Sequence, residues 1–167
     1  MNIVVIAGNP KPNSRTLDAG VRLAAGLGSP EATAVDVCSL GPGLLGWGDP
    51  AVKAAVETVA ASDLAIFASP TFKATYTGLL KLFLDQFTTA EGLRGITAVP
   101  LMLGAGPAHA MAADLLLKPV LVELGATCPA PGLFQQDSSY NTDSTGADYV
   151  ERWGTVLRAS VSAQPKS

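Results

Sequence analysis

The sequence DLAIFASPTFKATYTGLLKLFLDQF, residues 63–87, predicts a strand, a loop and a helix in succession. Residues 64–68 form a short apolar run typical of a strand that is buried on both faces of a sheet. Ser69-Pro70 ends this run, because proline lacks an N–H and pushes the preceding residue out of the helical region. Apolar residues then recur at the spacing of one helix face, at Tyr76, Leu79, Leu80, Phe83, Leu84 and Phe87. In open α/β sheets, a loop between such a strand and helix is where ligands bind.

The flanking segments alternate between strand and helix patterns in the same way. We expect strands at residues 3–7, 33–37, 64–68, 96–103 and 126–130. Helices are expected at residues 17–27, 50–61, 76–87, 108–124 and 148–163, and irregular loops at 41–48 and 135–145. Asp49-Pro50 is a typical helix start, and Pro119 should kink its helix or mark a bulge. This order predicts a single α/β domain over residues 1–167, with a five-stranded, parallel, doubly wound sheet.

Composition narrows the classes of function. The 167 residues include 48% apolar and only 15% charged residues, which suggests that another subunit covers part of the surface. A formal net charge of −3 argues against nucleic-acid binding. No apolar run reaches the length of a membrane span, and a strand-like segment begins at Asn2, so we expect neither a membrane anchor nor a signal peptide. Cys38 and Cys128 lie far apart without metal-ligand spacing, which indicates a reducing, cytoplasmic location and no metal site.

The loop after the first strand has the residues of a phosphate cradle. Backbone N–H groups at the start of the following helix, with the hydroxyls of Ser14 and Thr16, can bind an anion. Lys11 and Arg15 add positive charge at its rim. The same residues would also suit a helix N-cap without any ligand. The loop matches neither a GxGxxG nor a GxxxxGK[ST] pattern, so it predicts neither a dinucleotide site of the Rossmann type nor a P-loop.

Two segments resemble the NADPH-dependent FMN reductases. Gly8-Asn9-Pro10-Lys11 with Ser14 and Thr16 is similar to that family's G-S-x-R-x-x-S phosphate loop. Ser69-Pro70-Thr71-Phe72, followed by Tyr76, Gly78 and Leu80-Lys81, is similar to its S-P-x-Y-x-x-x-Y-x-G-x-L-K segment. The resemblance extends through Ala108-His109 and Leu117-Lys118-Pro119-Val120 to about Asp137, and favours the flavin reductases of two-component, alkanesulfonate-type monooxygenases. It implies a flavodoxin-like fold with strand order 2-1-3-4-5, bound FMN and a nicotinamide hydride donor.

The resemblance also implies a set of cofactor-binding residues. Asn9, Lys11, Ser14, Arg15 and Thr16 would hold the FMN phosphate. Pro70, Thr71, Phe72 and Lys73 would lie along the isoalloxazine ring, and Gly104, Ala105 and Gly106 would border its other edge. No catalytic side chain is expected, because hydride transfer is chemistry of the cofactors, and the protein aligns them and excludes water. Leu115 stands where the alkanesulfonate-type reductases carry an inserted tyrosine, which leaves open whether flavin is exchanged or retained.

The expected function is an NAD(P)H-dependent FMN reductase that supplies reduced FMN to a partner monooxygenase. Two alternatives remain open, and neither NADH nor NADPH is favoured. An enzyme that retains FMN could reduce quinones, azo dyes or metal oxyanions, and a flavodoxin-like electron carrier would have no enzymatic activity.

The helices at residues 76–87 and 108–124 predict a homodimer. Apolar residues surround nearly the whole circumference of the second helix: Met111, Leu115, Leu116, Leu117, Val120, Leu121, Val122 and Leu124. A helix that is apolar all round needs burial on all sides, and one sheet covers only one side. We therefore expect these helices at a homodimer interface with each flavin site near its edge, and the resemblance allows a homotetramer of two such dimers.

Overall fold

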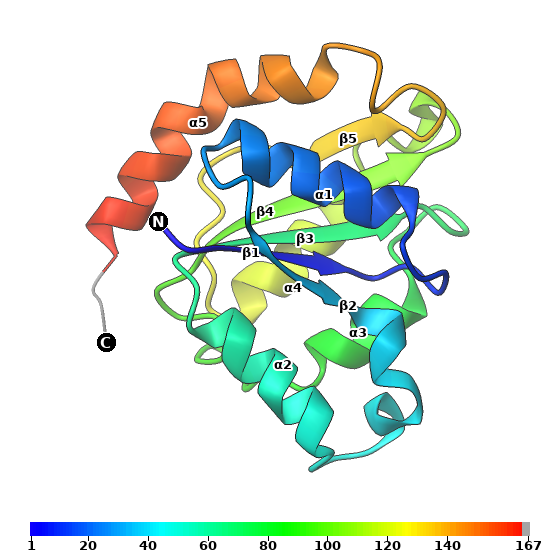
Figure 1. The fold of residues 1–167 in the computed structure, drawn as a ribbon, viewed down its shortest axis with the longest axis vertical. Coiled ribbons are helices and arrows are strands. Elements are labelled where there is room, and N and C mark those ends of the chain that lie inside the picture. Colours follow the sequence, from blue (N-terminus) through cyan, green and yellow to red (C-terminus); the bar gives the residue numbers. More distant parts are fainter. Residues whose placement is uncertain (165–167) are drawn as a thin grey trace.

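A computed structural model describes residues 1–164 and places one parallel sheet between two layers of helices (Figure 1). The strands are β1 (Ile3–Ala7), β2 (Thr33–Asp36), β3 (Leu64–Pro70), β4 (Thr97–Gly104) and β5 (Leu133–Gln136). Their order across the sheet is β2-β1-β3-β4-β5, and every neighbouring pair is parallel. The predicted fold class and strand order are confirmed.

Helices cover both faces of this sheet. On one face lie α1 (Arg15–Gly26) and α5 (Thr145–Ala163), and on the other lie α2 (Pro50–Ala60), α3 (Gly78–Leu84) and α4 (Lys118–Glu123) (Figure 1). Shorter helical segments complete the fold: the 3₁₀ segments η1 (Val37–Leu45) and η2 (Pro107–His109), and the π-helical turn η3 (Ala113–Leu117). No helix within residues 1–164 is long and apolar enough to cross a membrane.

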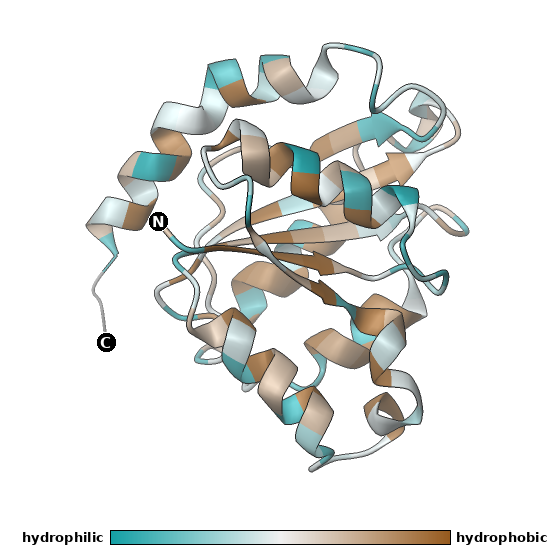
Figure 2. Cartoon of the chain, viewed as in Figure 1, coloured by the Kyte–Doolittle hydropathy of each residue, from teal (hydrophilic) through white to brown (hydrophobic). Residues whose placement is uncertain are grey.

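The central strands are mostly apolar because each of them contributes side chains to two cores (Figure 2). In β1, Val4 and Ile6 belong to the core under α2, α3 and α4, whereas Val5 belongs to the core under α1 and α5. In β3, Phe67 belongs to the core under α2, α3 and α4, and Ile66 belongs to the core under α1 and α5. Both side chains are fully buried. Alternate residues of a strand point to opposite faces, so a sheet covered on both sides needs a continuous apolar run.

Side-chain oxygens define where three of the helices begin. The Ser14 hydroxyl accepts a hydrogen bond from the Leu17 N–H at the start of α1. Asp49 caps α2 by accepting from two backbone N–H groups, and this confirms the predicted helix start. The Thr77 hydroxyl caps α3 and also donates to the Gly8 carbonyl, so it joins the start of α3 to the end of β1.

The predicted fifth strand at residues 126–130 was wrong. Residues 126–130 make only an isolated bridge between Thr127 and Thr97, and β5 follows at Leu133–Gln136, so that its last two residues fall in the expected loop 135–145. Pro129 and Pro131 explain the shift, because proline cannot donate to a sheet ladder and regular pairing begins only after both.

Two helix predictions and one loop prediction also need correction. The helix expected at residues 76–87 is shorter and spans Gly78–Leu84, and the glycine-rich segment 41–48 is partly the 3₁₀ helix η1. The helix expected at residues 108–124 is divided into η2, the π turn η3 and α4. The π turn lies immediately before Pro119, whose missing N–H interrupts the regular ladder. The predicted bulge at this proline is therefore confirmed.

Candidate functional site

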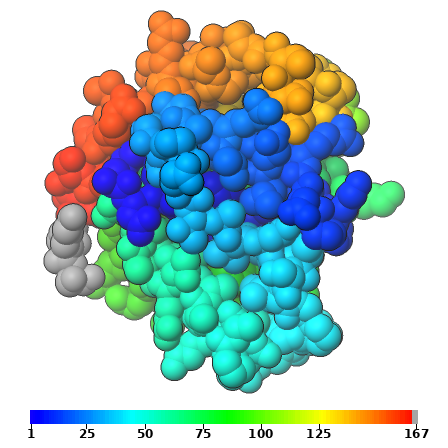
Figure 3. All heavy atoms as spheres, in the orientation of Figure 1, coloured from blue at the N-terminus to red at the C-terminus, as the bar shows by residue number. Residues whose placement is uncertain are grey.

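The segments that follow β1, β3 and β4 meet at one edge of the sheet and enclose a cavity of about 560 Å³. In the space-filling view, the segment after β1 and the turn after β3 both reach the surface at the right-hand edge (Figure 3). The cavity is lined by Asn9, Pro10, Lys11, Asn13, Ser14, Arg15, Thr16, Pro70, Thr71, Phe72, Leu103, Gly104, Ala105 and Asp137. Its volume is typical of a site for a small molecule or cofactor.

The loop between β1 and α1 is held in shape by Asn9. The Asn9 side-chain amide donates to the Thr16 hydroxyl at 3.0 Å, and its oxygen accepts from the Lys11 N–H at 2.9 Å. Asn13 adopts a left-handed backbone with φ of 50°, which asparagine tolerates better than most residues, and its N–H donates to Asp36. Asn9 thus shapes the loop, while the Lys11 side chain remains exposed at the rim.

The start of α1 presents N–H donors to this loop. Ser14 accepts from the Leu17 N–H, but within residues 1–164 the Arg15 and Thr16 N–H groups have no acceptor. The first N–H groups of a helix lack intrahelical partners and carry the positive end of its dipole. With Lys11 and Arg15 beside them, these donors make this wall of the cavity suited to an anionic group.

The loop after β3 forms the second wall. The Ser69 hydroxyl accepts from the Thr77 N–H at 3.0 Å, and the Thr71 N–H donates to the Leu103 carbonyl at 2.6 Å, so both ends of the loop are fixed. The Thr71 hydroxyl oxygen is buried, yet it has no hydrogen-bond partner within the described part of the chain. A buried polar atom without a partner is costly, and this one lines the cavity. It indicates a ligand group that completes its hydrogen bonding.

A tight turn at the rim separates Lys73 from the cavity. Phe72 and Thr75 exchange backbone hydrogen bonds of 2.9 and 3.2 Å, and Lys73 and Ala74 between them have φ values of 52° and 71°. This turn leaves the Phe72 side chain 49% exposed at the mouth of the cavity. Lys73 does not line the cavity, so the structure does not bring it together with the other proposed residues.

The third wall requires a glycine at position 104. A Cβ atom there would lie 2.9 Å from the Phe134 ring and 3.3 Å from the Thr71 hydroxyl oxygen. Ala105 lines the cavity, whereas Gly106 lies outside it. Apart from Lys73 and Gly106, the residues proposed from the resemblance all line one cavity, and their binding roles stay predictions.

Asp137 is the main lining residue that the sequence reasoning missed. Its N–H donates to the Gly104 carbonyl at 2.9 Å, and its own carbonyl accepts from the Arg15 guanidinium at 2.9 Å. Its carboxylate lies 3.7 Å from a second nitrogen of the same guanidinium. Asp137 directly follows β5, so correct placement of the fifth strand would have put it at this edge of the sheet.

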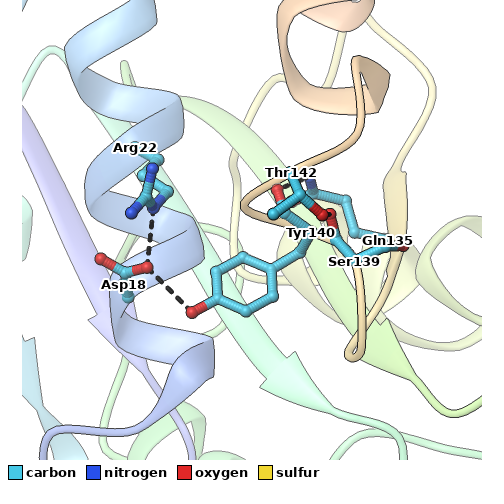
Figure 4. A network of polar contacts seen from close by, with 6 residues as sticks. All are labelled: Asp18, Arg22, Gln135, Ser139, Tyr140 and Thr142. Carbon is cyan, nitrogen blue, oxygen red and sulfur yellow. Dashed lines mark hydrogen bonds and ion pairs between the residues drawn. The ribbon is translucent and has the colours of Figure 1, made fainter.

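A separate hollow of about 440 Å³ lies between α1, α5 and the segment after β5. In this region Tyr140 and Arg22 both contact the Asp18 carboxylate (Figure 4). The Tyr140 hydroxyl donates to an Asp18 oxygen at 2.9 Å, and the Arg22 Nε donates to the same oxygen at 2.7 Å. Burial, followed by this contact with Asp18, raises the pKa of Tyr140. These contacts join the β5–α5 segment to α1.

We expect the Tyr140→Phe substitution to lower the free energy of unfolding by about 1 kcal/mol. It removes one hydrogen bond to a carboxylate, while Arg22 still pairs with that carboxylate, so the loss falls at the low end for such bonds. Urea denaturation checks the value. Tyr76→Phe is the matched control, because within residues 1–164 burial and nearby charges, and no hydrogen bond, act on the Tyr76 hydroxyl. Equal stabilities of the two variants would contradict a stabilising role of the Tyr140 contact.

Sequence comparison places the chain beside known flavin reductases. The family described as NADPH-dependent FMN reductase matches residues 1–140. The FMN reductase (NADPH) of Escherichia coli strain K12 is 40% identical over 89 residues, which are 53% of this chain and 46% of that protein. The FMN reductase (NADPH) of Pseudomonas putida KT2440 is 37% identical over 82 residues, 49% of this chain and 41% of that protein. The matching region therefore spans somewhat less than half the length of these curated relatives.

Solved structures match over nearly the whole chain. A NADH:FMN oxidoreductase in its apo form superposes with a TM-score of 0.82 and 29% sequence identity, covering 99% of this chain and 91% of that one. An oxidoreductase from Corynebacterium diphtheriae superposes with a TM-score of 0.76 and 20% sequence identity. The match covers 97% of this chain and 96% of that one, and at this identity it supports the fold alone.

Proposed function

The chain belongs to the NADPH-dependent FMN reductase family, and we propose that it reduces FMN with NADH or NADPH. The observation that carries this proposal is the cavity at the β1, β3 and β4 ends, where N–H donors suited to an anion lie beside a buried hydroxyl that has no partner among residues 1–164. We further propose that residues 1–167 form a single flavin-binding domain. Bound FMN would supply the redox chemistry by accepting hydride from the nicotinamide at N5.

The residues that line the cavity fit this cofactor. The Arg15 and Thr16 N–H groups, with Lys11 and the Arg15 guanidinium, would bind the phosphate at one end. Thr71 would donate to or accept from a polar edge of the flavin ring, which would give its buried hydroxyl the partner it lacks. Gly104 leaves space between Phe134 and Thr71 that any larger residue would fill, so a flat ring can approach the backbone.

The role of the protein in this reaction is to position the two cofactors and limit water. The exposed Phe72 side chain at the cavity mouth provides an apolar surface beside which a nicotinamide ring can lie. His109 lies outside the lining residues, and a hydride transfer needs no protein proton donor. Substitutions at this site should therefore alter binding more than chemistry.

Consumption of NADH and NADPH, followed at 340 nm with and without added FMN, tests the proposed function. A reductase that exchanges flavin should consume nicotinamide only when FMN is added, and FMN concentration should set the rate. A protein that retains flavin should instead be yellow as purified and need no addition. Absence of consumption under both conditions, with FMN bound, would identify an electron carrier and contradict the proposal.

The Ser14→Ala substitution should weaken FMN binding by about 1.5 kcal/mol, the low end of the range for a hydrogen bond to a charged group. Since Ser14 also caps α1, stability without flavin should fall by about 1 kcal/mol. Flavin fluorescence titration and urea denaturation measure the two effects. Asp49→Ala is the matched control, because it removes the cap of α2 away from the cavity and should reduce stability only. Unchanged FMN affinity in Ser14→Ala would place the phosphate elsewhere.

We also propose that two chains form a homodimer, which a tetramer could extend. Large apolar side chains are exposed on η3 and α4, with Leu115 64%, Leu116 40% and Val122 52% exposed. Trp47 and Leu45 add further exposed apolar surface beside α3. Surfaces of this kind mark protein contacts, and a second copy of the chain would cover them.

Two further assignments complete the proposal. Reduced FMN would pass to a flavin-dependent monooxygenase, because the cavity opens to solvent at Lys11 and Phe72 and would allow flavin to leave.

A cytoplasmic location is supported by Cys38 and Cys128, which form no disulfide in the part of the chain that the structure describes. Burial raises the pKa of the Cys128 thiol to about 11, so this cysteine is a packing residue and not a nucleophile.

A further inference from the structure

The phosphate end of the cavity contains a negative charge among its cations. Lys11, Arg15 and the N–H groups at the start of α1 all favour an anion, but Asp137, an acidic residue, lines the same cavity. This carboxylate lies 3.7 Å from the Arg15 guanidinium, and the Asp137 carbonyl accepts from the same group at 2.9 Å. Arg15, one of the two cations at the rim, is therefore already paired with the Asp137 carboxylate.

The position of Asp137 is fixed from both sides. Its N–H extends the ladder between β5 and β4 by donating to the Gly104 carbonyl. The buried Gln135 side chain, two residues before Asp137, donates to the carbonyl of Tyr140, three residues after it, at 3.2 Å, and the Tyr140 hydroxyl donates to Asp18 on α1 (Figure 4). Arg15 belongs to the same helix as Asp18, so α1 and the segment carrying Asp137 are held together at two places.

We propose that Asp137 weakens binding of the flavin phosphate and so makes the flavin an exchangeable substrate. This inference rests on the proposed function. The carboxylate acts in two ways, since it neutralises Arg15 and repels a phosphate bound in the same cavity. Because the segment is anchored, the carboxylate cannot leave the site by movement of the loop. The Asp137 carboxylate thus lowers the affinity for a flavin that carries a phosphate dianion and leaves the affinity for a flavin without phosphate unchanged.

The Asp137→Asn substitution isolates this effect. Asparagine keeps the size of the side chain and the backbone carbonyl that holds Arg15, and removes only the negative charge. At low ionic strength, FMN should bind about fivefold more tightly, the factor that corresponds to the repulsion of two neighbouring unit charges in water. Riboflavin, which lacks the phosphate, should bind with unchanged affinity. The gain for FMN should shrink in high salt.

Isothermal titration calorimetry of FMN and riboflavin against the wild type, Asp137→Asn and Glu57→Gln tests the proposal. Glu57→Gln makes the same change in net charge on α2, away from the cavity, and should leave both affinities unchanged. Equal or weaker FMN binding by Asp137→Asn, with normal binding by the wild type, would overturn this inference alone and give Asp137 the role of positioning Arg15. A parallel gain for riboflavin or for Glu57→Gln would also overturn it. Absence of FMN binding by the wild type would overturn the proposed function together with the inference.

Discussion

The Lys11→Ala/Arg15→Ala double variant should bind FMN about a hundredfold more weakly than the wild-type chain. Both cations lie at the rim of the cavity, beside the N–H groups of α1 that have no acceptor within residues 1–164. A hydrogen bond between charged groups contributes about 1.5–3 kcal/mol, and two exposed cations at the low end of this range together account for about a hundredfold. Removal of Arg15 also leaves Asp137 unpaired beside the phosphate. Flavin fluorescence titration measures the change.

Two controls make this result specific. Riboflavin should bind the double variant as it binds the wild type, because it has no phosphate to lose contact with. The Lys53→Ala/Arg94→Ala variant removes the same charge from α2 and from the segment before β4, and should retain FMN affinity. A decrease of equal size for riboflavin would mean that the ring site is damaged. An unchanged FMN affinity would show that the phosphate binds elsewhere.

The sheet could be predicted because its central strands are buried on both faces. β1 was predicted with its observed bounds, and β3 and β4 within two residues, since continuous apolar runs of this length have few other interpretations. The start of α2 was also predictable, because Asp49 and Pro50 act locally. These features depend on residues that are neighbours in the sequence, and the sequence pattern therefore specifies them.

The edge strand was missed because its pattern is weak. β5 is only four residues long, and two of them are the glutamines Gln135 and Gln136. Such a segment pairs only because β4 already presents an open ladder, which is a tertiary effect that no local pattern reports. The error also removed Asp137 from the candidate site, since the residue after a strand is placed only when the strand is placed.

The walls of the site show the same division between local and tertiary information. The helix start at Ser14, Arg15 and Thr16, which we propose as an anion cradle, was predictable from loop chemistry, because every helix start presents free N–H donors. By contrast, the exclusion of Lys73 depends on a turn in which Lys73 and Ala74 both take positive φ values without glycine. Sequence patterns for such turns rely on Gly, Asn or Asp, and this chain offers none there.

The Leu115→Glu/Leu116→Glu variant should convert the proposed homodimer into a monomer. Both leucines are exposed on η3, and burial of each in an interface would contribute roughly 1.5–3 kcal/mol. Two glutamates would remove that contribution and would also add charges whose burial without partners costs several kcal/mol. Light scattering on a size-exclusion column at micromolar protein should give twice 17.0 kDa for the wild type and 17.0 kDa for the variant.

A substitution on the opposite face of the molecule tests whether the loss of dimerisation is specific to η3 or is a general effect of added charge. Val156 is 39% exposed on α5, which covers the other side of the sheet, and Val156→Glu should leave the mass at that of the wild type. If η3 forms the interface, FMN affinity at high protein concentration should also fall in the η3 variant, because the expected flavin site lies near the edge of the dimer. A wild-type chain that is a monomer at these concentrations would refute the interface, and with it any contribution of a second subunit to the cavity. A dimeric η3 variant would move the interface away from η3, toward the exposed Leu45 and Trp47 beside α3.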